Sequence, residues 1–405
     1  MSLMRSAGAL VAFMWFAYFL NYCDRQAVFS MFPALRADLR MTDGQLGLVG
    51  SVFLWVYAFG CPASGILGDR FSKRLLVVLS LVVWSIVTLG TGLVASGSML
   101  LVMRAAMGVS ESLYMSSAVA LTAGAYPAGQ RSRAVSLLMT GQIAGTVAGS
   151  WFGGWMADLG RWRDAFFILG GVGIAFAIPY FKFLRGVGEP APETGSEFSF
   201  SGLGRSRTFL LLCAVFPVFV FGLWLLYGWL PAFLHDKFHL SQADAAFNAT
   251  VYLQSATLVG VLGGGMFADH LSRRVRAARF WLLAAGLGLS APCMHALGSC
   301  DTLAVTRLAA TGFGLFSGLF IANIFPAAFD VVAPGTRATA VGLLNFCGAV
   351  MSGFATLFGG LWKQSLGIDR LLSLTALAGL AAAAALVLGI RMLLPADHPQ
   401  TPVSS

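Results

Sequence analysis

Two copies of a short charged stretch decide the fold: GILGDRFSKR at Gly65–Arg74 and GMFADHLSRR at Gly265–Arg274. The first begins at position 65 and the second at position 265 of a 405-residue chain, and each joins two long apolar segments. Arg104 and Arg307 recur at a similar spacing. A chain that repeats itself at its midpoint, between apolar segments, is typical of two copies of one membrane bundle.

The composition favours lipid as the solvent of this chain. Hydrophobic residues make up 58% of the sequence and charged residues 11%, more apolar surface than a water-soluble protein of this size can bury. Runs of about 20 apolar residues can cross the hydrocarbon core as helices. The sequence therefore predicts an all-α membrane protein with 12 transmembrane helices in two pseudo-symmetric six-helix bundles. The predicted spans are 8–33, 44–67, 74–96, 98–126, 131–157, 164–184, 208–234, 243–267, 276–297, 302–331, 337–362 and 371–394.

Charge and loop composition predict the domains and the topology. The net charge of +9 comes mainly from Lys and Arg at helix ends, and these are more frequent on the side of the amino terminus. By the positive-inside rule both termini lie in the cytoplasm, and a bacterial inner membrane is the expected location. The charge thus marks topology and predicts no nucleic-acid partner; we expect a monomer. The predicted parts are an N-terminal bundle at 1–184, a cytoplasmic linker at 185–207, a C-terminal bundle at 208–396 and a cytoplasmic tail at 397–405.

Four ionisable residues lie well inside predicted spans of the first half, away from the span ends: Asp24, Arg25, Arg104 and Glu111. Each costs roughly 2.5–3.5 kcal/mol on insertion, so each needs a partner or a function. Arg104 and Glu111 share a helix face but stand about 10 Å apart along the axis, too far for a direct pair. Asp24 is the natural partner for Arg104. A static ion-pair network that only joins the two helices is one interpretation.

The other interpretation is a transport site. A carboxyl group in a poorly hydrated cavity can take up and release a proton, whereas an arginine stays charged and offers a planar fork to an anion. We therefore predict Asp24 and Glu111 as proton carriers and Arg25 as the clamp for an anionic small molecule.

The second half offers neutral groups at the corresponding positions. Adding 200 to Asp24 gives Trp224, and adding 203 to Glu111 gives Gly314. Proton chemistry is therefore expected in the first half only. Candidate substrate contacts in the second half, each of which also suits core packing or a helix–helix hydrogen bond, are Trp224, Tyr227, Asn323 and Asn345.

Two further patterns concern the motion of the helices. Glycines recur every four residues from Gly141 to Gly153, which predicts the close approach of another helix and allows sliding there. The repeated charged stretch predicts a cytoplasmic latch that uses charge contacts, although retention of basic loops in the cytoplasm also explains it. The predicted gate residues are Gly65, Asp69, Arg70, Lys73, Arg74, Arg131, Asp269, Arg273 and Arg274.

The charged stretch resembles the signature loop of the major facilitator superfamily, with Ser72 in place of the usual glycine and His270 in place of a basic residue in the second copy. The first half resembles the anion:cation symporter branch, which imports sugar acids and other organic anions with protons. The residues that carry this resemblance are Tyr22-Cys23-Asp24-Arg25, Tyr57, Arg104-x6-Glu111 and Gln142.

This resemblance implies roles for individual residues. Asp24 and Glu111 would be the proton sites, and Arg104 would pair with the acid of the first helix. The substrate pocket would be lined by Tyr22, Arg25, Tyr57, Gln142 and, on a looser match, Asn345.

The spinster-like branch, which carries lysolipids and sphingoid phosphates, is also similar. Its features here are Asn21-Tyr22-x-Asp24-Arg25-Gln26, Trp84-Ser85 and Phe71-Ser72-Lys73-Arg74. We expect proton-coupled symport of a small organic anion by alternating access, with spinster-like transport of an amphipathic anion, or proton-coupled export, as the alternatives. The sequence contains no nucleophile or metal-ligand pattern, so an enzyme, a metal and a cofactor other than the coupling proton are not expected.

Overall fold

The computed structural model describes residues 2–188, 203–275 and 277–397. Most of the predicted linker 185–207 and all but the first residue of the predicted tail 397–405 lie outside the described residues. The predicted domain boundaries therefore stay predictions.

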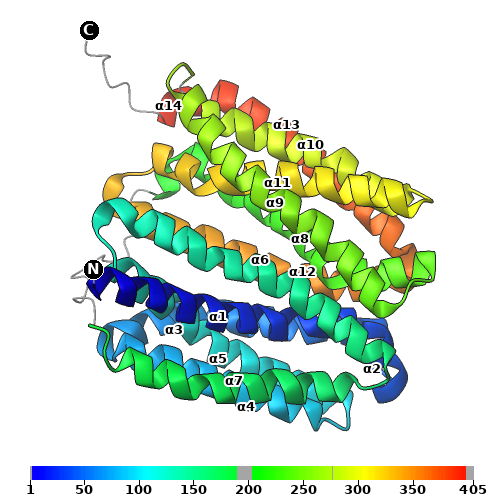
Figure 1. The fold of residues 1–405 in the computed structure, drawn as a ribbon. Helices are drawn as coiled ribbons and strands as arrows, with labels where there is room; N and C mark the ends of the chain where they lie inside the picture. The colour runs from blue at the N-terminus through cyan, green and yellow to red at the C-terminus, as the bar shows by residue number, and fades with distance from the viewer. Residues whose placement is uncertain (1, 189–202, 276, 398–405) are drawn as a thin grey trace. The chain divides into compact units, whose positions relative to one another are not determined.

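Twelve long helices dominate the described part of the chain, as the apolar runs predict (Figure 1). They are α1 Ser2–Ser30, α3 Asp43–Arg70, α4 Lys73–Gly92, α5 Gly97–Gly124, α6 Ala128–Asp158, α7 Trp162–Leu184, α8 Arg207–Phe238, α9 Gln242–Ser272, α10 Ala278–Ser299, α11 Leu303–Val331, α12 Arg337–Leu366 and α13 Ile368–Met392. Two short helices, α2 Phe32–Leu39 and α14 Leu394–Asp397, and two 3-10 turns at Leu203–Arg205 and Pro334–Thr336 complete the elements.

Nine helices of the described chain are long and apolar enough to cross a membrane by length and composition alone. The helices outside this group are α1, α5 and α6. α1 carries Asp24 and Arg25, α5 carries Arg104 and Glu111, and α6 carries the glycine face. The predicted proton-coupling residues Asp24, Arg104 and Glu111 therefore all lie on helices outside this group.

Local sequence signals explain where several helices begin. Thr42 and Gln45 form a capping box at the start of α3: the Thr42 side chain accepts from Gln45 N at 3.3 Å, and Gln45 Oε1 accepts from Thr42 N at 2.9 Å. Ser96 caps α5 in the same way, by accepting from Met99 N at 3.3 Å. Each cap satisfies backbone donors that have no partner within the first helical turn.

The chain divides into two compact units. Unit 1 contains Met1–Thr194, Leu226–Thr250 and Thr356–Leu361, so one end of α8, the start of α9 and one turn of α12 pack with the first six long helices. Within unit 1, Trp229 Nε1 donates to the carbonyl of Thr356 at 2.9 Å, and the hydroxyls of Ser51 and Thr356 lie 2.8 Å apart. Unit 2 contains Gly195–Leu225, Val251–Ala355 and Trp362–Ser405.

The glycine face of α6 lies directly against α1 in unit 1. A Cβ added at any of four glycines of α6 would come within 3.0 Å of α1 atoms. The predicted close approach is therefore confirmed, and the sliding interpretation stays a prediction. The glycines and the α1 residues that they meet are Gly141 with Trp15, Gly145 with Phe19, Gly149 with Cys23 and Gly153 with Ala27.

Packing inside the two units also corrects the alignment of the internal repeat. In unit 1, a Cβ at Gly108 of α5 would meet the carbonyl oxygen of Phe53 on α3. In unit 2, a Cβ at Gly314 of α11 would meet the carbonyl oxygen of Leu253 on α9. Gly314 therefore corresponds to Gly108, and the expected match of Gly314 with Glu111 is wrong by three residues.

The corrected alignment places Ser317 opposite Glu111. Ser317 is buried, and its hydroxyl donates to the carbonyl of Gly314 on its own helix at 3.0 Å. By the same alignment Ala310 corresponds to Arg104, so the expected match of Arg104 with Arg307 is also wrong by three residues. The position that holds an acid in the first copy therefore holds a small neutral side chain in the second.

Candidate functional site

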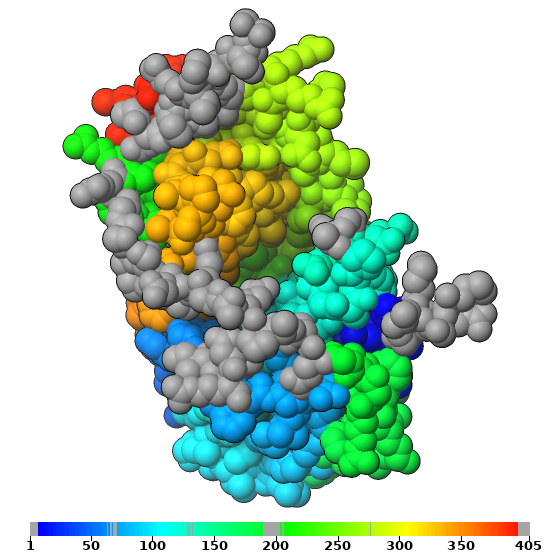
Figure 2. Space-filling model, turned by 90° about the vertical axis from the view of Figure 1, so that its left-hand side faces the viewer, coloured from blue at the N-terminus to red at the C-terminus, as the bar shows by residue number. Residues whose placement is uncertain are grey.

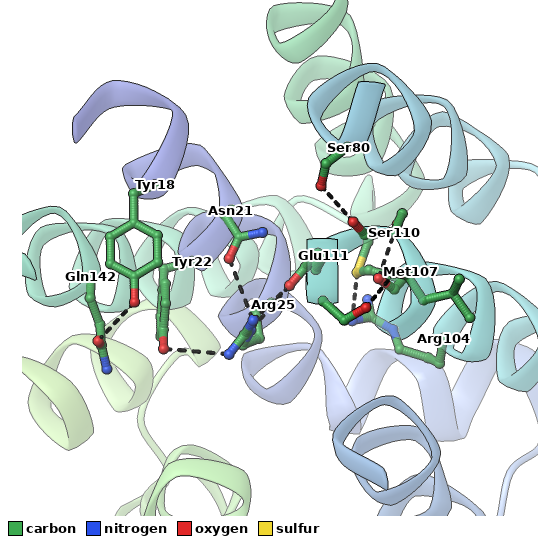
Figure 3. A network of polar contacts seen from close by, with 12 residues as sticks. Tyr18, Asn21, Tyr22, Arg25, Ser80, Arg104, Met107, Ser110, Glu111 and Gln142 are labelled. Atoms are coloured by element: carbon green, nitrogen blue, oxygen red, sulfur yellow. Dashed lines mark hydrogen bonds and ion pairs between the residues drawn. The ribbon is translucent and has the colours of Figure 1, made fainter. Parts of the chain in front are cut away.

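A buried ion pair between α1 and α5 forms the centre of the candidate site. The Arg25 guanidinium donates to Glu111 Oε2 from Nη2 at 2.8 Å and from Nε at 3.3 Å, and both side chains are buried. Figure 3 shows the Arg25 guanidinium between Glu111, Asn21 and Tyr22. A charge-assisted contact of this kind is stronger than a neutral hydrogen bond. Removing either partner leaves the other charge buried and unpaired in a low-dielectric interior.

Aromatic rings enclose the same guanidinium. The Cζ atom of Arg25 lies 4.6 Å from the ring centre of Tyr22, 4.7 Å from that of Phe53 and 4.9 Å from that of Tyr57. Arg25 also donates to the Tyr22 hydroxyl at 3.4 Å. Cation–π contacts hold a cation without neutralising it. Arg25 therefore keeps its charge and orientation, and Glu111 occupies the place where another anion could bind.

The expected pairing of Asp24 with Arg104 is not present among the described residues. Arg104 Nη1 contacts the sulfur of Met107 at 3.5 Å, while Arg104 Nη2, Arg104 Nε and Asp24 Oδ1 have no hydrogen-bond partner among the described residues. Consecutive residues of a helix point about 100° apart, so Asp24 and Arg25 cannot both face Glu111. Asp24 is close enough to Arg104 and Glu111 to interact with their charges, and it lies beside Thr88 of α4.

The remaining predicted substrate contacts fall into both units. In unit 1, Gln142 of α6 accepts a hydrogen bond from the Tyr18 hydroxyl at 3.2 Å, and Tyr227 is half-buried. In unit 2, Trp224 is half-buried and Asn345 is exposed. The structure thus brings Tyr22, Arg25 and Tyr57 together, and the substrate roles of all these residues stay predictions.

The first copy of the predicted latch is described only in part. Nothing is described of the side chains of Asp69 and Arg70 or of the surroundings of Gly65, so their part in a latch stays a prediction. The Arg74 side chain donates to the carbonyl of Val187 at 2.8 Å. Arg131 is exposed and donates to the carbonyl of Tyr126 at 3.1 Å, just before its own helix.

The second copy forms an ion-pair network in unit 2. Arg279 of α10 contacts Asp269 at the end of α9 at 3.5 Å, and it donates to both carboxylate oxygens of Asp330 on α11 at 3.0 and 3.1 Å. Arg273 and Arg274 are exposed. Sequence reasoning missed Arg279 and Asp330. The signal was available, because both lie within predicted spans, where an ionisable residue requires a partner.

In unit 1, the carboxylate of Asp158 at the end of α6 caps the start of α9. Asp158 Oδ1 accepts from Gln242 N at 2.8 Å, and Oδ2 accepts from Ala243 N at 2.9 Å. Backbone N–H groups at a helix start have no partner within the helix, and the helix dipole is positive there, so a carboxylate is stabilised. This contact joins the first half of the chain to the second, and no local sequence pattern predicts it.

Long apolar helices in two units, with paired charges buried in one of them, define an integral multi-pass membrane protein. Residues 14–356 match the family model described as Major Facilitator Superfamily, and the chain belongs to this family.

Several curated proteins are similar to this chain. Protein spinster homolog 1 of Bos taurus is 29% identical over 72% of this chain and 60% of its own length, and the human protein is 28% identical over 66% and 54%. The match thus spans only somewhat more than half of these relatives. The hexuronate transporter of Bacillus subtilis is 24% identical over 65% of each chain, and the probable sulfoacetate transporter of Cupriavidus necator is 29% identical over 69% of each.

A solved structure shares the fold. The bacterial homologue of the human lysosomal transporter spinster, in its inward-facing and unoccupied conformation, has a TM-score of 0.85 with 20% identity. The alignment covers 98% of this chain and 99% of that one.

Proposed function

We propose that this protein is a secondary active transporter that couples the movement of a small organic anion to protons by alternating access. Membership of the Major Facilitator Superfamily supports transport over enzymatic activity. Two similar proteins are named for organic acids, hexuronate and sulfoacetate, which supports an anionic substrate.

The buried pair of Arg25 and Glu111 carries the proposal. A proton that binds Glu111 removes its negative charge and leaves the Arg25 guanidinium without its anion. A carboxylate or phosphate of the substrate then takes the place of Glu111, because a planar fork binds such groups with two hydrogen bonds. Loss of the proton on the other side restores the Arg25–Glu111 pair and expels the substrate.

The number of protons carried per cycle decides whether transport moves net charge across the membrane. One proton on Glu111 with a monoanion moves no net charge. A second proton on Asp24 would move one positive charge per cycle, worth about 2.3 kcal/mol per 100 mV of membrane potential. Substrate currents in proteoliposomes distinguish the two: a current that depends on the potential supports two protons, and its absence at every potential supports one.

Transport of an amphipathic anion, such as a lysolipid, is the second candidate. The similarity to the spinster proteins favours it. Arg25 would then hold the phosphate or carboxylate of the headgroup. A thermal-shift screen of sugar acids, aromatic carboxylates and lysolipids on the purified protein separates the two classes by which of them stabilises it.

The substitution Glu111→Gln tests the coupling. A glutamine cannot release a proton, so we expect proton-driven accumulation in vesicles to be lost while counterflow of labelled substrate continues. Ser317→Ala, at the corresponding position of the second copy, is the matched control and should leave accumulation within about twofold of the wild type, because its hydroxyl makes one local bond. Accumulation by the Glu111→Gln protein at the wild-type level would remove this carboxyl group from the mechanism.

A further inference from the structure

The α6–α9 contact, which Gly154 and Asp158 of α6 make with Gln242 and Ala243 of α9, involves more than a helix cap. Each carboxylate oxygen of Asp158 accepts one backbone hydrogen bond, from Gln242 N at 2.8 Å and from Ala243 N at 2.9 Å. Gly154 lies one turn earlier on the same face of α6, and a Cβ added there would come within 2.5 Å of the Gln242 carbonyl oxygen. A glycine and a charge on one face of α6 therefore hold the backbone of α9 together.

The α6–α9 contact is part of a larger surface in unit 1. Two stretches of the second half of the chain, Leu226–Thr250 and Thr356–Leu361, belong to this unit. A Cβ at Gly47 of α3 would lie 2.6 Å from the carbonyl oxygen of Thr356, so α3 holds the second stretch as closely as α6 holds the first. Trp229 Nε1 donates to the same carbonyl at 2.9 Å. The two stretches are therefore linked to each other, and both are held by helices of the first half.

The α6–α9 contact can open at low cost. The Asp158 side chain is exposed, so water can replace both of its hydrogen bonds, and a glycine that leaves a backbone carbonyl has no side chain to repack. While the contact is closed, the carboxylate is stabilised by the positive end of the α9 dipole. The predicted topology puts the end of α6 on the outer side of the membrane. Figure 2 faces the opposite end of unit 1, where α6 (turquoise) begins.

We propose that the α6–α9 contact is a gate, which closes the outer side of the protein and opens once in each transport cycle. Asp158 holds the gate shut through its bonds to α9. When the start of α9 leaves α6, Trp229 and Thr356 become accessible to water, because their stretches are linked. The inference rests on the alternating access of the proposed function. It does not rest on the anion, the proton or Arg25.

Hydrogen–deuterium exchange of the purified full-length protein in lipid nanodiscs tests this inference without a substrate, because exchange reports how often a segment opens to water. Asp158→Ala removes both hydrogen bonds to α9. It should raise the population of the open gate about fivefold, the effect of losing a helix cap of typical strength. Exchange should therefore become faster at Gln242 and Ala243, and also in the peptides that contain Trp229 or Thr356.

Two further variants sharpen the test. Asp158→Asn keeps one carbonyl acceptor but loses the charge, so it should raise exchange by about twofold; it decides the question if Asp158→Ala fails to fold. Asp164→Asn is the matched control. Asp164 lies in the first turn of α7, and its carboxylate accepts a hydrogen bond from Arg161 Nε at 2.6 Å. This variant removes the same charge from a local pair, and no change in exchange is expected.

The proposal is wrong if the peptides around Trp229 and Thr356 exchange at the wild-type rate in both Asp158 variants, because Asp158 is then a helix cap and nothing more. It is also wrong if Asp164→Asn speeds their exchange as much as Asp158→Ala does, since loss of charge alone then explains the effect. A failure of the gate is distinguishable from a failure of the coupling. The exchange experiment needs no substrate, and the transport assay of Glu111→Gln does not depend on Asp158.

Discussion

The two copies of the repeat share backbone packing and differ in where they hold charge. Both place a glycine of one helix against a backbone carbonyl of another, Gly108 on Phe53 and Gly314 on Leu253. One turn further along, the first copy buries Glu111 and the second buries Ser317. Duplication therefore preserves the scaffold, because helix contacts tolerate little change, while the chemistry of the interior diverges.

Charge in the second copy lies at helix ends instead. Asp269, Arg279 and Asp330 form their network where α9 ends and α10 begins. A partly exposed network at helix ends exchanges its partners with water at low cost, whereas the buried Arg25–Glu111 pair cannot. We therefore propose a division of labour, in which the first copy binds the substrate and the second copy forms the latch.

The largest effect is expected from Arg25→Ala. Truncating one member of a buried hydrogen-bonded charge pair costs several kcal/mol, so anion affinity should fall by about 100-fold or more. Ligand-induced thermal stabilisation of the purified protein measures it. Arg370→Ala removes an exposed arginine from unit 2 and serves as the control for charge alone. If an anionic ligand stabilises the Arg25→Ala protein as fully as the wild type, Arg25 is not the anion clamp. The proposed difference in anion binding between the two copies is then wrong as well.

A smaller effect is expected from adding one methyl group at the paired glycines. Gly108→Ala and Gly314→Ala each force a Cβ against a backbone carbonyl, and both should lose about 1–3 kcal/mol of stability. Gly171→Ala and Gly263→Ala are the matched controls: nothing lies within 4 Å of a Cβ there, so helix propensity should leave stability equal or higher. The unfolding temperatures of the four variants, measured in the same detergent, test this expectation. Loss at only one of the paired glycines would show that the two positions do not correspond.

The smallest effect is expected in the network of Asp269, Arg279 and Asp330 in unit 2. Asp330 is 25% exposed and makes two hydrogen bonds to Arg279, while Asp269 is 76% exposed and makes one longer contact. Asp330→Asn should therefore lower stability by roughly 1.5 kcal/mol, and Asp269→Asn by less than about 0.5 kcal/mol. Thermal unfolding at low and high salt measures both. A larger loss for Asp269→Asn would mean that the solvent-exposed contact is the stronger one.

Much of this architecture is readable from the sequence. Apolar runs predict all twelve long helices, and the repeated loop predicts the two bundles. The cost of charge in a membrane singles out the four residues on α1 and α5. The pairing among them is not readable, because a helix turns about 100° per residue and only packing decides whether Asp24 or Arg25 meets Glu111.

Two other features could not be predicted from the sequence, each for its own reason. The alignment of Glu111 with Gly314 fails because the repeat spacing changes by several residues between α3 and α5, and one sequence does not show where the shift occurs. The cap that Asp158 places on α9 joins residues 84 and 85 positions apart in the chain, and local patterns do not report such contacts.

The glycine contacts between α6 and α1 have a mechanical consequence. From Gly141 to Gly153 the two helix backbones touch at every turn, over roughly 18 Å of helix length. Few side chains separate the two backbones here, and the Tyr18 hydroxyl also donates to Gln142, so we expect α1 and α6 to move together. Any rearrangement that exposes Arg25 to one side and then the other must carry Gln142 along with it, and the bending that it requires must take place in other helices.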